Sequence, residues 1–263
     1  MTYVFSLVNQ KGGVGKTTTA VNLATAVAAC GKRTLIIDLD SQGNATTAFG
    51  LTAEQREPSS YDVIVENTLL DEAIKPTIIP YLFICPASVD LAGTDVLLST
   101  RIGREYILKK RIEALKTQFD YIFLDCPPSL GLLTINALTA SNFTLIPLQC
   151  EFYSLEGLSY LLNTVDMVQQ NLNDKLDIGG ILLTMYDRRN KLTNEVEGDV
   201  RKHFKEVVFQ TMIPRNVKLS EAPSHGQPGI IYDHRCSGSK AYMLLARELL
   251  TRFPTDEILK KAS

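Results

Sequence analysis

The sequence has no large net charge, no paired cysteines and no long apolar run, and each absence narrows the range of possible functions. Its 27 basic and 29 acidic residues leave a formal net charge of −2 and a pI near 6.0. No global electric field therefore draws the chain to nucleic acid or to a membrane. We expect any contact with a polyanion to come from a local cluster of basic residues.

The five cysteines are odd in number and widely spaced, and no two of them form a C-x-x-C pair. This pattern argues against a disulfide framework and against a zinc site, and it fits a reducing cytosol. The longest apolar runs, such as 34–37 and 144–148, are far too short to span a bilayer. No charged leader with an apolar segment and a cleavage site opens the sequence, so we expect a cytoplasmic protein.

Apolar residues make up 45% of the 263 residues, which is enough for one substantial core. We expect one domain over 1–263 that ends in a flexible tail over 253–263. Short β-rich runs predict strands at 3–9, 34–38, 82–86, 121–125, 143–148, 178–184 and 207–213. Stretches with helical periodicity predict helices at 16–30, 104–116, 132–140, 155–171, 194–204 and 239–252. The segment 51–80 has three prolines and only short periodic pieces, and it gives the weakest prediction.

Continuous apolar strands such as 35–37 and 122–124 suit a sheet that is covered on both faces. The alternation of strands with helices implies mostly parallel order and right-handed crossovers. We therefore predict an α/β fold with a doubly wound sheet. Ligands of such sheets bind at the carboxyl ends of the strands. The loops expected to converge there begin at Gln10, Asp38, Asp125, Met185 and Pro214.

Residues 9–18, with the sequence NQKGGVGKTT, form a glycine-rich loop between an apolar strand and a helix. Three glycines let the backbone turn tightly and aim several N–H groups at one anion, and the positive end of the following helix adds a partial charge. Lys16 would neutralise the β- and γ-phosphates of a nucleotide, and Thr17 would place its hydroxyl on Mg²⁺. The alternative is a glycine turn that caps an ordinary helix.

The usual phosphate-loop pattern, G-x-x-x-x-G-K-[ST], needs a glycine where this chain has Gln10, and the chain carries an additional lysine, Lys11. The loop therefore resembles the deviant Walker A box of the ParA/MinD group of ATPases. That resemblance implies that Lys11 reaches the nucleotide of a partner subunit. The expected nucleotide contacts in the loop are Lys11, Gly12, Gly13, Val14, Gly15, Lys16, Thr17 and Thr18.

Two of the predicted strands end at an aspartate, Asp38 and Asp125, and a third aspartate, Asp40, follows the first of these strands. Asp38 and Asp40 leave the sheet beside the phosphate loop, and phosphoryl transfer to water needs a group that orients the attacking water. We expect Asp40 to take that role and Asp38 to lie nearer the metal; the alternative is that both only form a turn or a helix cap. Asp125 ends an apolar strand in the manner of a Walker B acid that holds Mg²⁺. Cys126 has no histidine near it in sequence, so we expect a packed side chain rather than a nucleophile.

The segments 38–46, 125–129 and 213–226 resemble the chromosomal ParA (Soj) family of DNA-partitioning ATPases, and the resemblance extends over nearly the whole chain. In that family the last of these stretches lines the adenine, so the resemblance assigns base contacts to Pro214 and Asn216. A proline ring offers a flat apolar face, and an asparagine amide can read a donor–acceptor edge.

The resemblance further implies that two ATP-loaded subunits close face to face and then bind double-stranded DNA without sequence preference. Arg189 and Lys218 are the strongest candidates for phosphate contact, and Arg188 and Lys191 belong to the same basic cluster as Arg189. For each of them an ordinary solvated face is the alternative. A ParB-like, centromere-bound partner would accelerate ATP hydrolysis, and the protein would associate with the nucleoid.

Three other classes of protein share this loop or its chemistry. A MinD-like positioning ATPase needs a C-terminal amphipathic helix that inserts into lipid, but Pro254 interrupts 248–261 and acids at 256–257 oppose an anionic surface, so we expect no membrane binding. An iron–sulfur reductase of the nitrogenase type needs two cysteines per subunit at the dimer axis, and no suitable pair is evident. A metabolic ligase of the dethiobiotin synthetase type needs a substrate pocket that the sequence does not identify.

Overall fold

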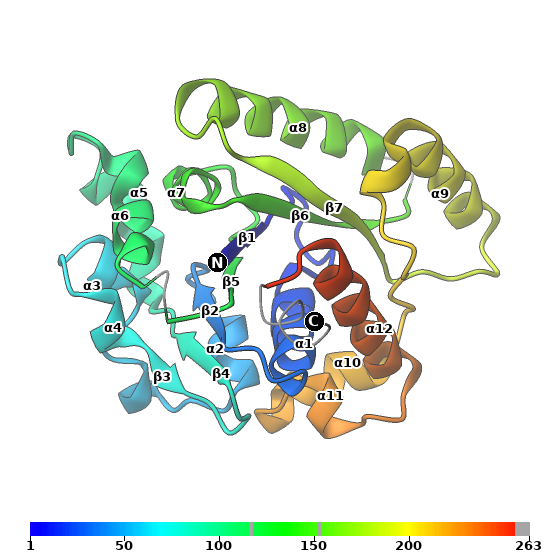
Figure 1. Ribbon diagram of the computed structural model, residues 1–263, viewed down its shortest axis with the longest axis horizontal. Coiled ribbons are helices and arrows are strands. Elements are labelled where there is room, and N and C mark those ends of the chain that lie inside the picture. The colour runs from blue at the N-terminus through cyan, green and yellow to red at the C-terminus, as the bar shows by residue number, and fades with distance from the viewer. Residues whose placement is uncertain (116–117, 152–153, 256–263) are drawn as a thin grey trace, which may run out of the picture.

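The computed structural model describes residues 1–115, 118–151 and 154–255, which fold around one seven-stranded sheet (Figure 1). The strands are β1 (Tyr3–Leu7), β2 (Thr34–Asp38), β3 (Lys75–Pro76), β4 (Leu82–Cys85), β5 (Tyr121–Asp125), β6 (Phe143–Gln149) and β7 (Asp177–Thr184). Their order is β3-β4-β2-β5-β1-β6-β7, and the described strand pairs are parallel except for β3 with β4. The predicted α/β fold with a mostly parallel sheet is confirmed.

Helices cover both faces of this sheet. The longer ones are α1 (Lys16–Ala29), α6 (Ile107–Glu113), α7 (Leu132–Ala140), α8 (Ser154–Asn171), α9 (Lys191–Phe204) and α12 (Ser237–Arg252). Shorter helical segments are α2 (Asn44–Ala48), η1 (Ala53–Arg56), α3 (Ser60–Ile64), α4 (Leu70–Ala73), η2 (Val89–Gly93), α5 (Thr94–Leu97), η3 (Arg104–Tyr106), η4 (Lys205–Val207), α10 (Val217–Glu221), η5 (Ala222–His225) and α11 (Gly229–Tyr232). The predicted helix end at 116 lies outside the described residues. Of the tail predicted over 253–263, Phe253 packs against Phe5 and Phe143 and Thr255 is buried, so its first residues belong to the folded body. The residues beyond 255 lie outside the described part of the chain.

The central strands divide their side chains between two cores. In β1, Val4 packs with α6, α7 and α8, whereas the neighbouring Phe5 packs with α1 and α12. In β5, Ile122 and Phe123 separate in the same way. Because successive side chains of a strand point to opposite faces, a strand buried on both faces must be apolar throughout. Among the described residues no helix has the length and hydropathy required to cross a bilayer.

The predicted strand over 207–213 is wrong. Near its ends the segment does run beside the edge strand β7: Val208 forms an isolated parallel bridge with Ile181, and the N–H groups of Phe209 and Ile213 donate to carbonyls of β7. In its middle, the backbone N–H groups of Gln210 and Thr211 donate to the carboxylate of Glu248 in α12, at 2.9 and 3.0 Å. A side chain therefore takes the place of a strand partner, and no continuous ladder forms.

Replacing Glu248 with alanine should lower the free energy of unfolding by about 1–2 kcal/mol, because two backbone donors lose their acceptor in a partly buried site. Burial raises the pKa of Glu248, but the bonds from Gln210 and Thr211 and the charge of Arg252 outweigh burial and the pKa is lowered. This stabilisation is thus present above the ordinary glutamate pKa and is lost as the pH falls through the lowered value.

Urea unfolding at neutral pH measures the effect, with Glu195→Ala on the exposed face of α9 as the matched control. Equal unfolding free energies for the two variants would show that water replaces the Glu248 carboxylate at no cost.

Candidate functional site

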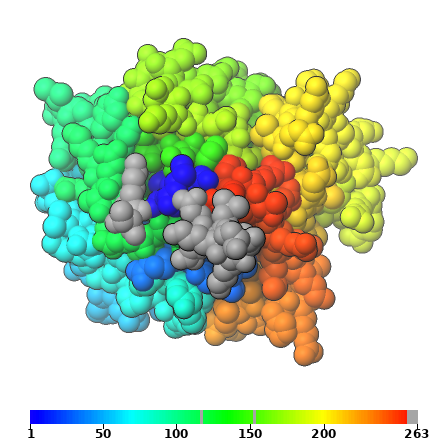
Figure 2. Space-filling view, in the orientation of Figure 1, coloured from blue at the N-terminus to red at the C-terminus, as the bar shows by residue number. Residues whose placement is uncertain are grey.

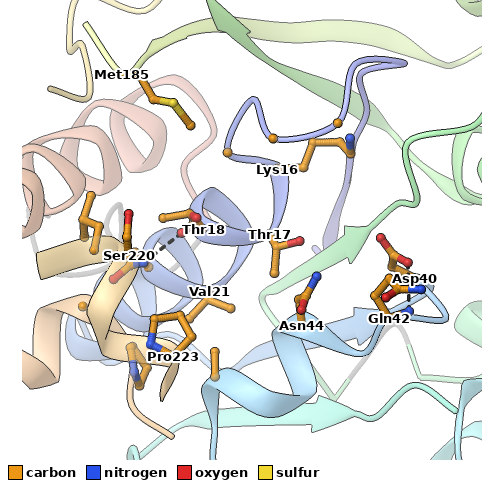
Figure 3. Close-up of a pocket in the computed structure, with 18 of the residues that line it drawn as sticks. Lys16, Thr17, Thr18, Val21, Asp40, Gln42, Asn44, Met185, Ser220 and Pro223 are labelled. Carbon is orange, nitrogen blue, oxygen red and sulfur yellow. Dashed lines mark hydrogen bonds between the residues drawn. The ribbon is translucent and has the colours of Figure 1, made fainter. Parts of the chain in front are cut away.

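A cavity of about 430 Å³ opens beside the loop between β1 and α1, at the carboxyl ends of the strands. Figure 3 shows Lys16, Thr17, Asp40 and Asn44 on one side of it and Ser220 across from them. A second cavity of about 290 Å³ shares part of this wall and is lined by segments 184–185 and 213–217. The loops after β1, β2 and β7 thus converge as predicted, and the two cavities together offer an elongated site.

The loop before α1 has the backbone shape that an anion site requires. Gly13 and Gly15 have φ angles of +75° and +91°, in the left-handed region where a side chain would be strained. Gly15 caps α1, and its carbonyl accepts the first helical hydrogen bond from Thr19 N at 2.9 Å. The free N–H groups of the first turn of α1 therefore face the cavity with the positive end of the helix dipole.

Lys16 is folded back across this loop. Its Nζ donates to the backbone carbonyls of Asn9 and Lys11 at 2.9 and 3.2 Å, and the residue is only 7% exposed. Burial lowers the pKa of Lys16, while the nearby charges of Asp125 and Asp40 act in the opposite direction. An ammonium group held by carbonyls alone is poised to exchange them for stronger anionic acceptors.

Two fully buried aspartates lie at the ends of the adjacent strands β2 and β5. Asp38 accepts hydrogen bonds from the backbone N–H and the hydroxyl of Thr46 in α2, at 2.9 and 2.7 Å. Burial raises the pKa of Asp38 to about 6, against the effect of those bonds. Asp38 thus anchors α2 to the sheet, and its expected place near the metal stays a prediction.

Asp125 contrasts with Asp38, because neither of its buried carboxylate oxygens has a hydrogen-bond partner in the described part of the chain. Burial raises the pKa of Asp125 well above its ordinary value, and the charge of Asp38 raises it further; the Thr17 hydroxyl, which is close but does not meet hydrogen-bond geometry, lowers it. A buried carboxylate without a donor is costly unless a cation compensates it. Asp125 and Thr17 therefore fit the oxygen donor set that Mg²⁺ prefers.

Asp40 lies at the mouth of the same cavity and is 9% exposed. One of its oxygens accepts a hydrogen bond from the backbone N–H of Gln42 at 3.0 Å, while no described residue donates to the other. Figure 3 shows the Asp40 side chain on the same side as Lys16 and Asn44. The carboxylate therefore keeps one oxygen available to a ligand or a water molecule.

Lys11 forms an ion pair with Glu151, which follows β6, and both side chains are about half exposed. The backbone N–H of Lys11 donates to Asn9 Oδ1 at 3.0 Å. In the free subunit Lys11 thus turns away from its own phosphate loop toward an acid. Sequence reasoning did not find Glu151, because no spacing rule relates it to a residue 140 positions earlier.

Pro214 and Asn216 both line the second cavity, as the predicted base contacts should. The amide oxygen of Asn216 accepts from Lys218 N at 2.9 Å and caps α10, and its amide nitrogen donates to Ser237 Oγ at 2.9 Å. One amide N–H remains for a ligand. Tyr242, which the sequence did not suggest, also lines this cavity and bonds Thr19 through its hydroxyl at 3.1 Å.

The two strongest candidates for DNA contact are both paired with acids. Arg189 binds both oxygens of Asp187, at 2.8 and 3.0 Å, and these hydrogen bonds lower the pKa of Asp187 to about 2. Lys218 Nζ donates to Glu221 at 2.8 Å. Each cation is exposed and each partner is close in sequence, so the pairs leave the cations accessible to another anion.

Arg188 and Lys191 extend the cluster around Arg189, and both are exposed beside the start of α9. The segment that carries Arg188 and Arg189 is joined to the base-contact segment by the bond from Tyr186 N to Ile213 O at 2.9 Å. The structure thus brings the predicted DNA-contact and base-contact residues onto two adjacent segments.

Comparison with known proteins identifies relatives that match nearly the whole chain. Residues 2–178 match a family model described as an AAA domain. The sporulation initiation inhibitor protein Soj of Bacillus subtilis is 52% identical over 246 residues, which cover 94% of this chain and 97% of the relative. The chromosome partitioning protein ParA of Caulobacter vibrioides is 50% identical over 252 residues, covering 95% and 94%.

Solved structures support the same fold. Cobyrinic acid a,c-diamide synthase from Mycobacterium smegmatis with bound ADP and magnesium has a TM-score of 0.85, with 35% identity and coverage of 97% and 96%. The Pyrococcus furiosus cell division ATPase MinD has a TM-score of 0.80, with 26% identity and coverage of 95% and 99%. Since about half of the residues are shared with partitioning proteins over almost their full lengths, the chain belongs to the ParA/Soj family of chromosome-partitioning ATPases.

Proposed function

We propose that this chain is an ATP-driven DNA-partitioning switch that closes as a dimer on DNA with ATP and leaves DNA after hydrolysis. One observation carries the proposal: the buried, unpartnered carboxylate of Asp125 lies near Lys16 and Thr17 at a glycine loop shaped for phosphate. A phosphate-binding loop, a cation for the phosphates and an uncompensated acid for Mg²⁺ are the elements of phosphoryl transfer.

In this proposal Lys16 exchanges its two carbonyl acceptors for the β- and γ-phosphates, and the backbone of Gly12 to Thr18 donates to the remaining oxygens. Thr17 and Asp125 would hold Mg²⁺, with Asp38 near its water shell. When bound, the metal neutralises charge that develops on the transferred phosphoryl group. The adenine takes the second cavity, against Pro214 and the free N–H of Asn216.

Asp40 is the group that orients the attacking water, since its second oxygen is free and faces the cavity. Lys11 would leave Glu151 and reach the nucleotide of the facing subunit, where its ammonium group stabilises transition-state charge. That role follows from family resemblance, and the exposed position of the Lys11 pair supports it. A ParB-like partner would accelerate hydrolysis, so the intrinsic rate should be low.

The comparison with cobyrinic acid a,c-diamide synthase names a different class, an enzyme that acts on a metabolite. Identity to that protein is lower than identity to the partitioning proteins. Phosphate release from Mg-ATP, measured with purified protein and duplex DNA alone, separates the classes. Stimulation by DNA in the absence of any metabolite supports the proposal, and hydrolysis that requires an added small acid would overturn it.

Arg189→Glu should retain the ATP-bound dimer but bind duplex DNA at least about tenfold more weakly at 0.1 M salt, because a phosphate contact is lost and a repulsive charge replaces it. Binding is measured with a non-hydrolysable ATP analogue, and dimerisation by light scattering. Lys110→Glu on α6 makes the same charge change at an exposed position toward the opposite edge of the sheet from α9 (Figure 1). If both variants bind DNA equally well, Arg189 is not a DNA contact.

A further inference from the structure

Two short helical segments that are far apart in the sequence, α2 and η5, meet at a contact between two glycine backbones. Gly50 follows α2, and Gly226 caps η5. A Cβ atom added to Gly226 would lie 2.9 Å from Gly50 Cα, and one added to Gly50 would lie 3.2 Å from the Gly226 carbonyl oxygen. In Figures 1 and 2 the orange segment around α11 borders the blue and cyan segments around α2. We call this the Gly50–Gly226 contact.

On one side the contact is connected to Asp40 through the backbone of α2. Gly43 N donates to Asp40 O at 2.8 Å, Thr47 N donates to Gly43 O at 2.9 Å, and Gly50 N donates to Thr47 O at 2.9 Å. A continuous chain of three backbone hydrogen bonds thus runs from Asp40 to the contact. Because α2 has only five residues and packed segments transmit displacement, a shift of Gly50 reaches Asp40.

On the other side the contact belongs to the wall of the first cavity. Gly226 N donates to Pro223 O at 3.0 Å, and Pro223 lines this cavity together with residues 227–229. The helix α2 lines the same cavity with Asn44 and Ala48. Figure 3 shows Asn44 and Pro223 at the cavity on their two separate segments. A ligand in the cavity therefore meets residues on both sides of the contact.

The contact leaves little room for adjustment, because backbone atoms form both of its sides. A flexible side chain could rotate away from an added methyl group, whereas a backbone atom moves only with its segment. Carbon atoms in favourable contact lie about 3.5–4.0 Å apart, so an alanine at position 226 has to separate the two segments by about 0.6 Å or more. A displacement of about 1 Å at a catalytic group can cost about a hundredfold in rate.

We propose that Gly50 and Gly226 are positioning residues for hydrolysis: their contact fixes Asp40 relative to the cavity wall 223–229 and so sets the rate of the chemical step. Neither glycine lines the nucleotide cavity, so neither contributes to the affinity for ATP directly. This rests on the proposed function, because it requires that the chain hydrolyses ATP with Asp40 as the group that orients water. It adds a determinant of rate that lies outside the phosphate loop.

The variant Gly226→Ala tests the proposal. It should bind a non-hydrolysable ATP analogue within about threefold of the wild-type affinity, but hydrolyse bound ATP about tenfold more slowly in a single turnover. Gly50→Ala, whose added Cβ meets the carbonyl oxygen at 3.2 Å, should show a smaller loss of rate. Gly31→Ala is the matched control, because its φ of +79° strains an alanine in the same way while nothing lies within 4 Å of the added Cβ. The control should hydrolyse ATP at the wild-type rate.

Hydrogen exchange of backbone amides reports on α2 without depending on turnover. With the ATP analogue bound, the amides of 43–50 should exchange faster in Gly226→Ala than in wild type, because the displaced helix loses part of its hydrogen-bond chain. In Gly31→Ala their exchange should match wild type. Both variants place alanine at a left-handed φ angle, so a difference between them reports the contact and not the backbone strain.

Equal single-turnover rates for Gly226→Ala and Gly31→Ala would overturn the proposal. A loss of affinity as large as the loss of rate would also overturn it, because position 226 would then only shape the binding cavity. If Gly226→Ala does not fold, Gly50→Ala decides by the same comparison. If wild-type protein hydrolyses no ATP, the proposed function fails together with this inference. If wild type hydrolyses ATP and both variants at the contact do so at its rate, only the role of the contact fails.

Discussion

Lys16→Ala should abolish measurable ATP binding. The ammonium group is buried in the phosphate loop with only backbone carbonyls as partners, so its charge is available to the phosphates. A hydrogen bond to a charged group contributes about 1.5–3 kcal/mol, and two such contacts correspond to a loss of affinity of about a hundredfold or more. Isothermal titration calorimetry with Mg-ATP measures this loss of affinity directly.

Lys11→Ala is the informative control for that experiment. Because Lys11 pairs with Glu151 in the free subunit, its removal should leave the affinity of one subunit for ATP nearly unchanged while it prevents the closed dimer. The same loop thus carries two lysines with separable effects. If Lys16→Ala binds Mg-ATP as tightly as wild type, the phosphate-loop assignment is wrong.

Asp40→Ala should bind ATP and dimerise but hydrolyse ATP about 10²–10⁴-fold more slowly, the usual effect of removing a group that handles the reacting water. The carboxylate lies at the cavity with one oxygen free and the other bound to Gln42 N. Single-turnover hydrolysis with bound radioactive ATP separates the chemical step from binding and release.

Asp40→Asn distinguishes chemistry from loop structure, because an amide oxygen still accepts the bond from Gln42. A loss of turnover in both variants, with ATP-dependent dimers intact, assigns the effect to the negative charge. Normal turnover by Asp40→Ala would remove Asp40 from the mechanism.

Much of the fold was predictable because its determinants are local. The helix 132–140 was predicted with its observed bounds, and Gly131 lies directly before it. The strands 34–38 and 121–125 were also predicted with their bounds, since in each an apolar run ends at an aspartate. The strand predicted at 207–213 failed because a carboxylate of α12, and not a neighbouring strand, accepts the hydrogen bonds of its central N–H groups. Local hydrophobicity carries no information about such a partner.

The segment 51–80 was poorly predicted for a different reason. It folds into the two-residue strand β3 and into η1, α3 and α4, helices of four or five residues that are too short to show a periodic pattern. Two of them begin with a capping box, Thr52 with Gln55 and Ser59 with Asp62. Those pairs at a spacing of three are visible in the sequence and could have marked both helix starts.

In the candidate site, too, local features were predictable from the sequence and long-range contacts were not. The phosphate loop was predictable because contiguous residues build it. The partners that hold its acids and lysines come from elsewhere: Thr46 binds Asp38 from α2, and Glu151 binds Lys11 from beyond β6. The metal, base and DNA assignments remain predictions that the experiments above address.

The ion pairs of Arg189 with Asp187 and of Lys218 with Glu221 have a consequence for transport. In the proposed switch, a single subunit whose exposed cations are paired with its own acids is held weakly by DNA and diffuses away before it binds again. Because exposed pairs contribute little free energy, phosphates displace the acids readily once two subunits present their cations together. Under this proposal, weak retention of single subunits would separate release from rebinding and so sustain a concentration gradient of the protein along DNA.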